Sequence, residues 1–236
     1  MGLITNGGLI DDAKSKQRGQ IMFQNIDWAN LQNPHLFING DCMEYMKTMP
    51  DKYVDLCICD PPYGLGDAVV NSKGRFARYE NKSGNWDMLP PGDEYFEELF
   101  RVSKNQIIWG GNYFNLPPSK CFLIWDKRQP EGVTFASSEL AWTSFDKVVK
   151  TFYMLPNQQK GRFHPTQKPV ALYKWLLKNY AKPGDKILDT HVGSASSLIA
   201  CYDMGFDYIG FEIDEEYYKT AQKRIAENKA QMRMIL

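Results

Sequence analysis

The chain contains a short motif that could do chemistry: Asp60, Pro61, Pro62 and Tyr63, which directly follow the apolar run VDLCIC at 54–59. A continuous apolar run is typical of a buried strand, so Asp60 is expected at the carboxyl end of a strand, where α/β sheets bind ligands. The prolines stiffen the turn and carry no N–H, which leaves the Pro61 carbonyl without a local donor. A carboxylate beside a rigid carbonyl suits an exocyclic amine, and Tyr63 offers a ring for stacking. The alternative is an ordinary turn that ends a strand.

A second set of candidate residues follows a later apolar run, KILDT at 186–190. Asp189 could hold an ammonium group directly or through water. Gly193 would let the backbone pass close to a ligand, and the helical pattern that begins at Ser194 would present free N–H groups to a carboxylate. Glu212 ends the next apolar run and is placed to accept hydrogen bonds from ribose hydroxyls. Taken singly, each of these residues also has an ordinary structural explanation.

Short apolar runs alternate with helical patterns along the chain. The apolar runs cover residues 36–39, 54–59, 105–111, 121–126, 138–145, 186–190 and 206–213. The helical patterns cover residues 42–49, 93–104, 169–181, 194–205 and 214–232. Because the apolar runs are mostly continuous, they predict strands covered on both faces by helices, as in a doubly wound, mostly parallel α/β sheet. One domain is expected over residues 1–236, with an N-terminal arm over 1–34.

Composition narrows the class of protein. The 236 residues carry no net formal charge, which argues against nucleic-acid binding by bulk charge alone, although basic residues outnumber acidic ones between Lys120 and Lys186. No apolar stretch reaches the roughly 18 residues of a membrane span, and the N-terminus does not follow a signal-peptide pattern, so we expect a cytoplasmic protein without membrane contact. The five cysteines form no C-x-x-C pair and are expected to be reduced. The three histidines are too scattered to predict a metal site.

These motifs, in this order, resemble the S-adenosylmethionine-dependent amino-methyltransferases of DNA, in which D-P-P-Y is the catalytic motif. The segment LDTHVGSASSLIACYDMGFDYIGFEID at 188–214 resembles the cofactor motif of that family, and HPTQKP at 164–169 resembles the short motif before it. The resemblance covers roughly residues 36–225. Because the catalytic motif precedes the cofactor motif, the chain resembles the circularly permuted β class, which implies a seven-stranded sheet of the class I methyltransferase type.

The resemblance implies a catalytic site at Asp60, Pro61, Pro62 and Tyr63, with S-adenosylmethionine as the cofactor. It implies the following cofactor-binding residues: Asp41, Cys42, Thr166, Gln167, Lys168, Asp189, His191, Gly193, Ser194 and Glu212. Asp41 is expected near the cofactor's adenine, and Lys168 is expected to pair with its carboxylate. The chain departs from the family at His191, where relatives carry phenylalanine, and at Ala195, where they carry glycine. Alanine can occupy the first turn of a helix, so the bend before the helix is expected to remain viable.

The implied reaction is direct, in-line transfer of a methyl group to the N6 amino group of an adenine that has swung out of DNA. Cytosine N4 in DNA, an amino group in RNA, and a non-catalytic DNA-binding relative with a weakened cofactor site are the alternatives. A nicotinamide-dependent oxidoreductase is disfavoured because no G-x-G-x-x-G follows an expected strand. The expected partner is single- or double-stranded DNA, contacted by loops at 64–86 and 155–163, and the target-recognition region is minimal. The resemblance also suggests a homodimer and a restriction endonuclease as partners.

Overall fold

The computed structural model of the protein describes residues 26–32, 35–64, 89–130, 136–155, 163–164 and 166–233. The chain divides into two units, Met1–Asn33 and Pro34–Leu236. Where the first unit is described, it contains a turn in which the Asp27 carboxylate accepts hydrogen bonds from the amides of Ala29 and Asn30. The loops predicted to contact DNA lie almost entirely outside the described residues. No helix in the described ranges is long and apolar enough to cross a membrane.

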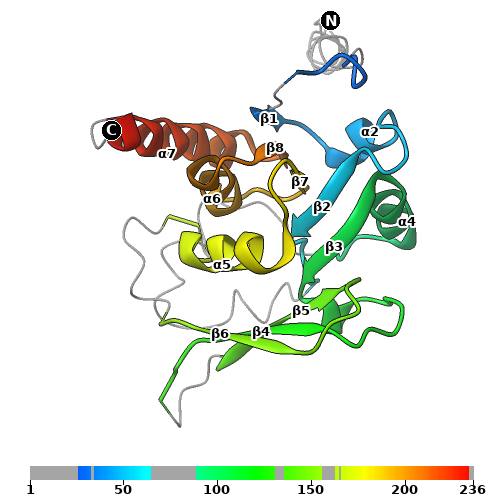
Figure 1. Ribbon diagram of the computed structural model, residues 1–236, viewed down its shortest axis with the longest axis vertical. Helices are drawn as coiled ribbons and strands as arrows, with labels where there is room; N and C mark the ends of the chain where they lie inside the picture. The colour runs from blue at the N-terminus through cyan, green and yellow to red at the C-terminus, as the bar shows by residue number, and fades with distance from the viewer. Residues whose placement is uncertain are drawn as a thin grey trace, which may run out of the picture. The chain divides into compact units, whose positions relative to one another are not determined.

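The second unit is built on one mixed sheet in which eight strands are described (Figure 1). The strands are β1 (His35–Asn39), β2 (Val54–Cys59), β3 (Ser103–Trp109), β4 (Phe122–Asp126), β5 (Ser138–Thr143), β6 (Lys150–Tyr153), β7 (Lys186–Asp189) and β8 (Asp207–Glu212). Their order in the sheet is β1-β8-β7-β2-β3-β5-β4-β6. Only β5, among these strands, runs antiparallel to its neighbours.

All seven apolar runs therefore form strands, and the mostly parallel sheet is confirmed. The sheet has one strand more than the seven expected. The additional strand is β6, a four-residue strand at the edge of the sheet, whose side chains are all exposed or half-buried. Because an edge strand contributes little to the core, it lacks the apolar run that marks the other strands.

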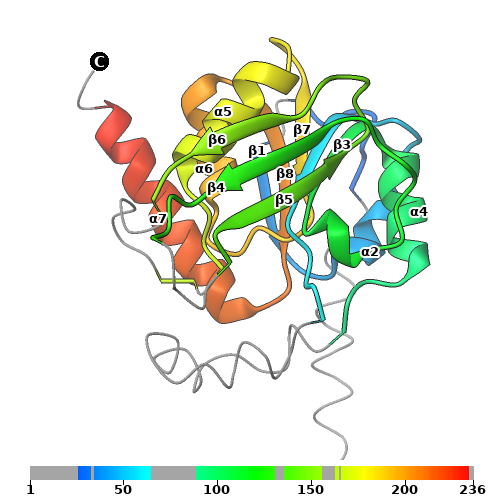
Figure 2. The same ribbon diagram turned by 90° about the horizontal axis from the view of Figure 1, so that it is seen from below.

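Helices cover both faces of the sheet (Figures 1 and 2). On one side lie α5 (Val170–Tyr180), α6 (Ser196–Met204) and α7 (Glu215–Arg233), and on the other lie α2 (Cys42–Met46) and α4 (Asp93–Val102). All five predicted helices are confirmed, with ends that differ by a few residues. A short 3-10 helix, η1 (Gly111–Tyr113), follows β3. The fold is thus the expected doubly wound one.

Close packing of α6 on the sheet depends on Gly210 in β8. A Cβ at this position would lie 2.6 Å from Cγ2 of Val192 and 2.8 Å from Cδ1 of Leu198. Since Leu198 is fully buried, neither neighbour can move aside without disturbing the core. Glycine at 210 therefore sets how near the first turn of α6 comes to the strand ends.

The strand order creates a switch point between β7 and β2. These two strands are parallel neighbours, with Leu56 opposite Ile187 and Cys57 opposite Leu188. From β7 the chain continues to β8 on one side, whereas from β2 it continues to β3 on the other. Doubly wound sheets bind ligands beyond the carboxyl ends of the strands at such a point. In this sheet, those ends carry Asp189 and Asp60.

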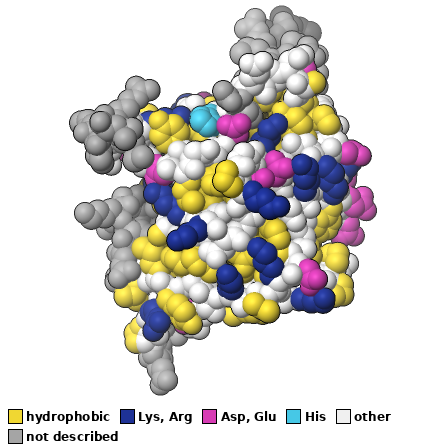
Figure 3. Space-filling model, viewed as in Figure 1, with side chains coloured by type: hydrophobic (Ala, Val, Ile, Leu, Met, Phe, Trp, Pro, Cys, Tyr) yellow, Lys and Arg dark blue, Asp and Glu magenta, His cyan; other side chains and the backbone are white. Residues whose placement is uncertain are grey.

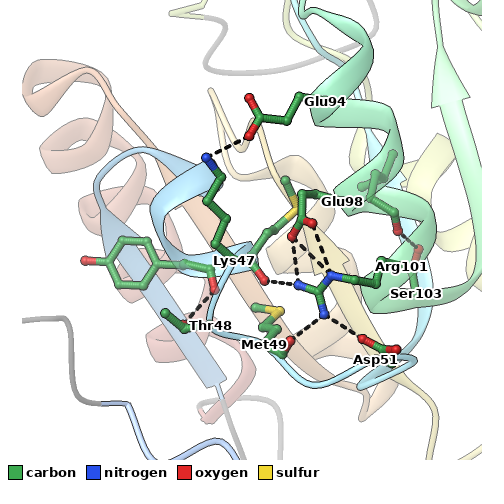
Figure 4. Close-up of polar contacts among 11 residues, drawn as sticks. Lys47, Thr48, Met49, Asp51, Glu94, Glu98, Arg101 and Ser103 are labelled. Atoms are coloured by element: carbon green, nitrogen blue, oxygen red, sulfur yellow. Dashed lines mark hydrogen bonds and ion pairs between the residues drawn. The ribbon is translucent and has the colours of Figure 1, made fainter.

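Arg101 joins α2 to α4 on the other face of the sheet (Figure 4). Its guanidinium donates hydrogen bonds to the carbonyl of Met46 (2.6 Å), the last residue of α2, and to the carbonyl of Met49 (2.7 Å), which follows the helix. It also pairs with the carboxylates of Glu98 (2.7 Å) and Asp51 (2.8 Å). Because helix ends leave carbonyls unpaired, this one side chain caps α2 and fixes it against α4.

We expect Arg101→Ala to lower the free energy of unfolding by about 1 to 3 kcal/mol, the cost of a carbonyl without a donor. The Met49 carbonyl loses its donor, whereas the Met46 carbonyl keeps the hydrogen bond from the Met49 amide at 3.0 Å. Urea unfolding followed by circular dichroism measures the change. Lys47→Ala is the matched control, since the ion pair between Lys47 and Glu94 is more than half exposed at both ends, with 55% and 67% of the side chains accessible. An exposed ion pair of this kind contributes little to stability. Equal losses in the two variants would contradict the capping role of Arg101.

Candidate active site

Two cavities open at the carboxyl ends of the strands, and Asp60 lies in the wall of both. The larger cavity has a volume of about 490 Å³ and the smaller one about 290 Å³. Asp60, Pro62 and Thr166 line both cavities. A molecule in each cavity would therefore meet its neighbour at the Asp60 carboxylate. The volumes are those of sites for small molecules or single planar groups.

The larger cavity collects nearly all of the predicted cofactor-binding residues. Those on its wall are Asp41, Cys42, Thr166, Gln167, Lys168, His191, Gly193, Ser194 and Glu212. Asp189 does not line the cavity and lies beneath it, with only 2% of its surface exposed. Three tyrosines on the wall, Tyr95, Tyr173 and Tyr217, were not predicted. They lie on helices, where the sequence pattern indicated only amphipathic packing.

Glu212 presents both carboxylate oxygens at the end of β8. Oε2 accepts a hydrogen bond from the amide of Gly193 at 2.8 Å, and Oε1 accepts one from the amide of Asp214 at 2.9 Å. Burial raises the pKa of Glu212, although both amides oppose this shift. Each oxygen keeps capacity for a second donor. The fixed orientation suits a ligand with neighbouring hydroxyl groups.

Asp189 is a buried acid, and burial disfavours its ionised form. Oδ1 accepts a hydrogen bond from the amide of His191 at 3.0 Å, and the Ser197 hydroxyl donates to Oδ2. Burial nevertheless raises the pKa of Asp189 to about 7. A cation in the cavity above would favour the ionised form of this carboxyl group. Asp189 is therefore suited to interact with a positively charged ligand group in the cavity, through neighbouring residues or through water.

His191 contributes a neutral ring to the larger cavity. Burial lowers the pKa of His191 to about 4, so the imidazole is uncharged near neutral pH. Its ring meets the ring of Tyr95 edge-on, with centroids 5.5 Å apart. Its Nδ1 is 2.9 Å from the hydroxyl of Thr190, which also bonds the hydroxyl of Tyr95 at 2.7 Å. The histidine thus keeps the flat surface that a phenylalanine would supply.

The helix predicted over residues 194–205 begins at Ser196, so Ala195 lies outside it. Ala195 precedes α6 and adopts a left-handed conformation, with φ of 61°, and does not lie in the first helical turn. The chain must turn sharply between Gly193, with φ of 50°, and the start of α6 at Ser196. A residue with a side chain pays about 1 to 2 kcal/mol for this conformation. Arg224 stabilises the turn by donating hydrogen bonds to the Ser194 carbonyl at 2.6 Å and the Ser196 hydroxyl at 2.9 Å.

Lys168 lies beside the predicted catalytic acid. Its ammonium pairs with the Asp60 carboxylate and, at 3.0 Å, with Glu139, and only 1% of its side chain is exposed. Burial alone would lower the pKa of Lys168, but the two carboxylates reverse this effect and raise it. Burial raises the pKa of Asp60 against the opposing charge of Lys168. Lys168 therefore stays protonated, and its positive charge limits how far burial raises the pKa of Asp60.

Glu139 and Lys127 complete this buried group of charges. Lys127 pairs with Glu139 at 2.6 Å. Although burial opposes ionisation, Lys168 and Lys127 together lower the pKa of Glu139 to about 2. Two positive and two negative side chains thus balance one another beside the cavities. Neither Glu139 nor Lys127 was predicted, although an acid at the start of an apolar run, as in SELAWTSF, is a signal that could have found Glu139.

The smaller cavity is lined by all four residues of the predicted catalytic motif. The hydroxyl of Tyr63 donates a 2.5 Å hydrogen bond to Oδ1 of Asp60. The ring of Tyr63 stacks on that of Tyr113, with centroids 5.0 Å apart and planes 20° apart. This aromatic pair gives the cavity a flat surface next to carboxylate and carbonyl acceptors.

Gly110 makes room for the ring of Tyr63. A Cβ at Gly110 would lie 2.2 Å from Cε1 of Tyr63 and 2.6 Å from both Cδ1 and Cζ, which places it above the face of the ring. Gly110 also has a φ of 68°. Both the conformation and the close approach therefore require glycine at this position.

The sheet and its covering helices have the fold of the class I methyltransferases. Two solved structures share this fold. The complex of M1.HpyAVI with S-adenosylmethionine is 24% identical with a TM-score of 0.50, and the comparison covers 80% of this chain and 98% of that one. PvuII DNA methyltransferase, which is cytosine-N4-specific, is 14% identical with a TM-score of 0.57, and covers 84% and 94% of the respective chains.

The sequence itself matches a family of DNA methylases, the N6/N4 methylases, over residues 108–223. It is also 28% identical over 211 residues to YubD of Escherichia coli (strain K12), which is named as a methylase, across 80% of this chain and 89% of that protein. The protein is therefore similar to the DNA methylases over residues 108–223 and to YubD over most of its length.

Proposed function

We propose that the protein transfers the methyl group of S-adenosylmethionine to the N6 amino group of adenine in DNA. The observation that carries this proposal is the position of Asp60 in the shared wall of two cavities. The larger cavity suits the cofactor and the smaller one a single base. The amino group to be methylated would then meet the methyl donor beside the one carboxylate that both cavities share.

The residues of the larger cavity fit S-adenosylmethionine. Glu212 offers two oriented acceptors for ribose hydroxyls, and the neutral ring of His191 offers a flat contact surface. Asp189, with its raised pKa, gains from the positive charge of the methionyl ammonium. When bound, S-adenosylmethionine supplies an electrophilic methyl group on a sulfonium. Lys168, which was expected to hold the cofactor's carboxylate, is assigned instead to Asp60 because its ammonium already pairs there.

The smaller cavity fits a base that has left the DNA stack. Oδ1 of Asp60 and the carbonyl of Pro61 accept the two N–H bonds of the amino group, which draws the nitrogen lone pair out of conjugation. Tyr63 must first release its hydrogen bond to Oδ1, and its ring then supports the base by stacking. Asp60 receives the proton that the methylated nitrogen loses, and burial favours this because it raises the pKa of Asp60.

Adenine is proposed over cytosine because Asp60 stands where cytosine-N4 members of the family usually carry serine. Cytosine N4 is the second candidate, because the matching family comprises both N6 and N4 methylases and the fold is shared with a cytosine-N4-specific enzyme. Both bases present an amine next to a ring nitrogen, so the acceptors at Asp60 and Pro61 suit either one.

The test is incubation of the purified protein with tritiated S-adenosylmethionine and unmethylated genomic DNA, followed by digestion and mass spectrometry of the nucleosides. We expect N6-methyladenine. N4-methylcytosine as the product would replace the adenine assignment, and the absence of any methylated base, with the cofactor bound, would overturn the proposal. An RNA substrate in a parallel reaction tests the remaining alternative.

We expect Asp189→Asn to stabilise the protein at pH 8 while it weakens cofactor binding. The folded pKa of about 7 exceeds the ordinary value of 3.8, so the folded state binds a proton more tightly than the unfolded chain. Stability therefore falls as pH rises between these two values, and the full cost is present above pH 7. An amide removes up to about 4 kcal/mol of this cost, since one pKa unit is worth about 1.4 kcal/mol. Thermal unfolding at pH 5 and pH 8, with calorimetry of cofactor binding, measures both effects. A loss of stability at pH 8 would contradict the assignment.

We expect Gly110→Ala to lower kcat at least tenfold with little change in cofactor affinity, because the new methyl group would displace the ring of Tyr63. Gly184→Ala is the matched control. Gly184 has a φ of 86°, so it carries the same backbone strain, but a Cβ there meets nothing within 4 Å. Both variants should lose about 1 to 2 kcal/mol of stability. If kcat fell equally in the two variants, strain alone would explain the loss and the role of Tyr63 would be refuted.

A further inference from the structure

We propose that Arg128 and Tyr153 bind a DNA phosphate next to the extruded base, a role that rests on the proposed function. Arg128 directly follows Lys127, whose side chain lines the smaller cavity. Tyr153 ends β6 and is paired with Asp126 at the end of β4, which runs parallel to it. Both residues therefore lie at the same edge of the sheet as Asp60, within reach of a strand whose base enters the smaller cavity.

The two side chains form an exposed cation-π pair. The guanidinium carbon of Arg128 lies 4.3 Å from the centroid of the Tyr153 ring, and 55% of Tyr153 is exposed. Stacking on an aromatic face holds the planar guanidinium in place, while its N–H donors remain directed to the side. Such a group is suited to bind phosphate oxygens in a fixed orientation.

The charge of Arg128 differs from that of the neighbouring Lys127. Lys127 is neutralised by Glu139 at 2.6 Å, whereas Arg128 forms no ion pair with any residue in the described part of the chain. The nearest acid on its own turn is Asp126, which accepts a hydrogen bond from the Arg128 amide at 2.7 Å. An uncompensated guanidinium at the rim of a base-sized cavity is complementary to the phosphate backbone.

The backbone holds Arg128 in a costly conformation. Its φ is 49°, which is unusual for a residue with a side chain. The turn is fixed by the bond to Asp126, by the amide of Lys127 donating to the Ser137 carbonyl at 2.9 Å, and by the amide of Met154 donating to the Asp126 carbonyl at 3.1 Å. Strain of this kind persists where the surroundings determine the geometry, which is common at binding sites.

Other basic residues of the same region point elsewhere. Lys150 begins β6, at the opposite end of this strand from Tyr153, and its ammonium bonds the side-chain oxygen of Asn179 at 3.1 Å. Lys147 bonds the Asn179 carbonyl at 3.0 Å. Figure 3 shows lysine and arginine side chains spread over one face among hydrophobic and acidic ones, without a single basic patch. The position of Arg128 at the cavity rim therefore distinguishes it from the basic residues around it.

The test compares Arg128→Asn with Lys150→Gln, each of which removes one positive charge at one end of the β4/β6 pair. Asparagine tolerates the left-handed conformation, so it removes the charge without new strain. Binding of a fluorescent mixed-sequence DNA duplex is measured by anisotropy between 50 and 200 mM salt, with calorimetry of S-adenosylmethionine as the check of folding. We expect Arg128→Asn to weaken binding about 3- to 10-fold and to reduce the slope of log K against log salt by about 0.7 to 0.9, the value for one phosphate contact.

Lys150→Gln should change DNA affinity less than twofold. Arg128→Lys should keep the salt slope with reduced affinity, because it retains the charge but not the planar group, and Tyr153→Ala should weaken binding more than Tyr153→Phe. Equal salt slopes in Arg128→Asn and the unaltered protein would overturn the proposal. The two ideas fail separately: a protein that methylates DNA with an unchanged slope in Arg128→Asn refutes only this contact. A protein that binds DNA through Arg128 without methylating it refutes only the proposed reaction.

Discussion

Asp60→Ala should lower kcat by at least about 10²- to 10³-fold, the cost of removing one group that stabilises charge in a transition state. Asp60 accepts the amino N–H, draws the nitrogen lone pair toward the methyl donor and receives the proton, and no other side chain in the described ranges lines both cavities with a carboxylate. The protein should stay folded, because Lys168 keeps Glu139 as a partner at 3.0 Å. Single-turnover methyl transfer measures the loss.

Asp203→Ala is the control for Asp60→Ala. Asp203 is also a mostly buried acid in an ion pair, with 8% of its side chain exposed and Lys174 at 2.6 Å, but it lies near the end of α6 and lines neither cavity. The Asp203→Ala variant should be less stable than the unaltered protein but should keep its kcat. Asp60→Asn should also be impaired, because it retains the shape and one acceptor but not the charge. Near-normal transfer by Asp60→Ala, with the cofactor bound, would exclude the proposed role.

The elements and their order could be predicted from the sequence because they depend on local patterns. Continuous apolar runs such as VDLCIC bury both faces of a strand, and every such run forms a strand in the sheet. The four catalytic-motif residues and nine of the ten cofactor-binding candidates also line the cavities, and most of them lie at or just after the carboxyl end of a strand. Position along the chain was enough to place them.

Pairings between distant residues could not be predicted in this way. Lys168 lies 108 residues from Asp60 in sequence, and its choice between the cofactor's carboxylate and Asp60 depends on three-dimensional distances that a motif does not contain. Glu139 was part of an apolar run, so its charge was overlooked. The helical pattern was extended to Ser194, whereas the chain takes a left-handed conformation at Ala195 before α6 begins. In each case tertiary geometry decided against the local signal.

Lys168→Met should reduce transfer at neutral pH and move its pH profile to higher pH. An adjacent positive charge typically lowers a carboxyl pKa by about 1 to 3 units, so its removal raises the pKa of Asp60 further, beyond the effect of burial. Transfer needs the ionised carboxylate, and activity therefore rises with pH through this pKa. We expect a loss at pH 7 that is partly regained at pH 9. Rates between pH 5 and pH 9 measure the shift.

Stability should move in the opposite direction in the same variant. Removing one partner of a buried ion pair costs about 3 to 5 kcal/mol while the carboxylates left behind are charged. Because the folded pKa of Asp60 then lies further above its ordinary value, the folded state binds its proton more tightly than the unfolded chain, and stability falls as pH rises through that folded pKa. Lys168→Arg, which keeps the charge, should restore both profiles in part. If Lys168 instead held the cofactor's carboxylate, Lys168→Met would raise the Kd for S-adenosylmethionine and leave the pH profile of bound enzyme in place. Activity that rises with pH while stability falls would therefore show that Lys168 controls the charge of Asp60 and does not bind the cofactor.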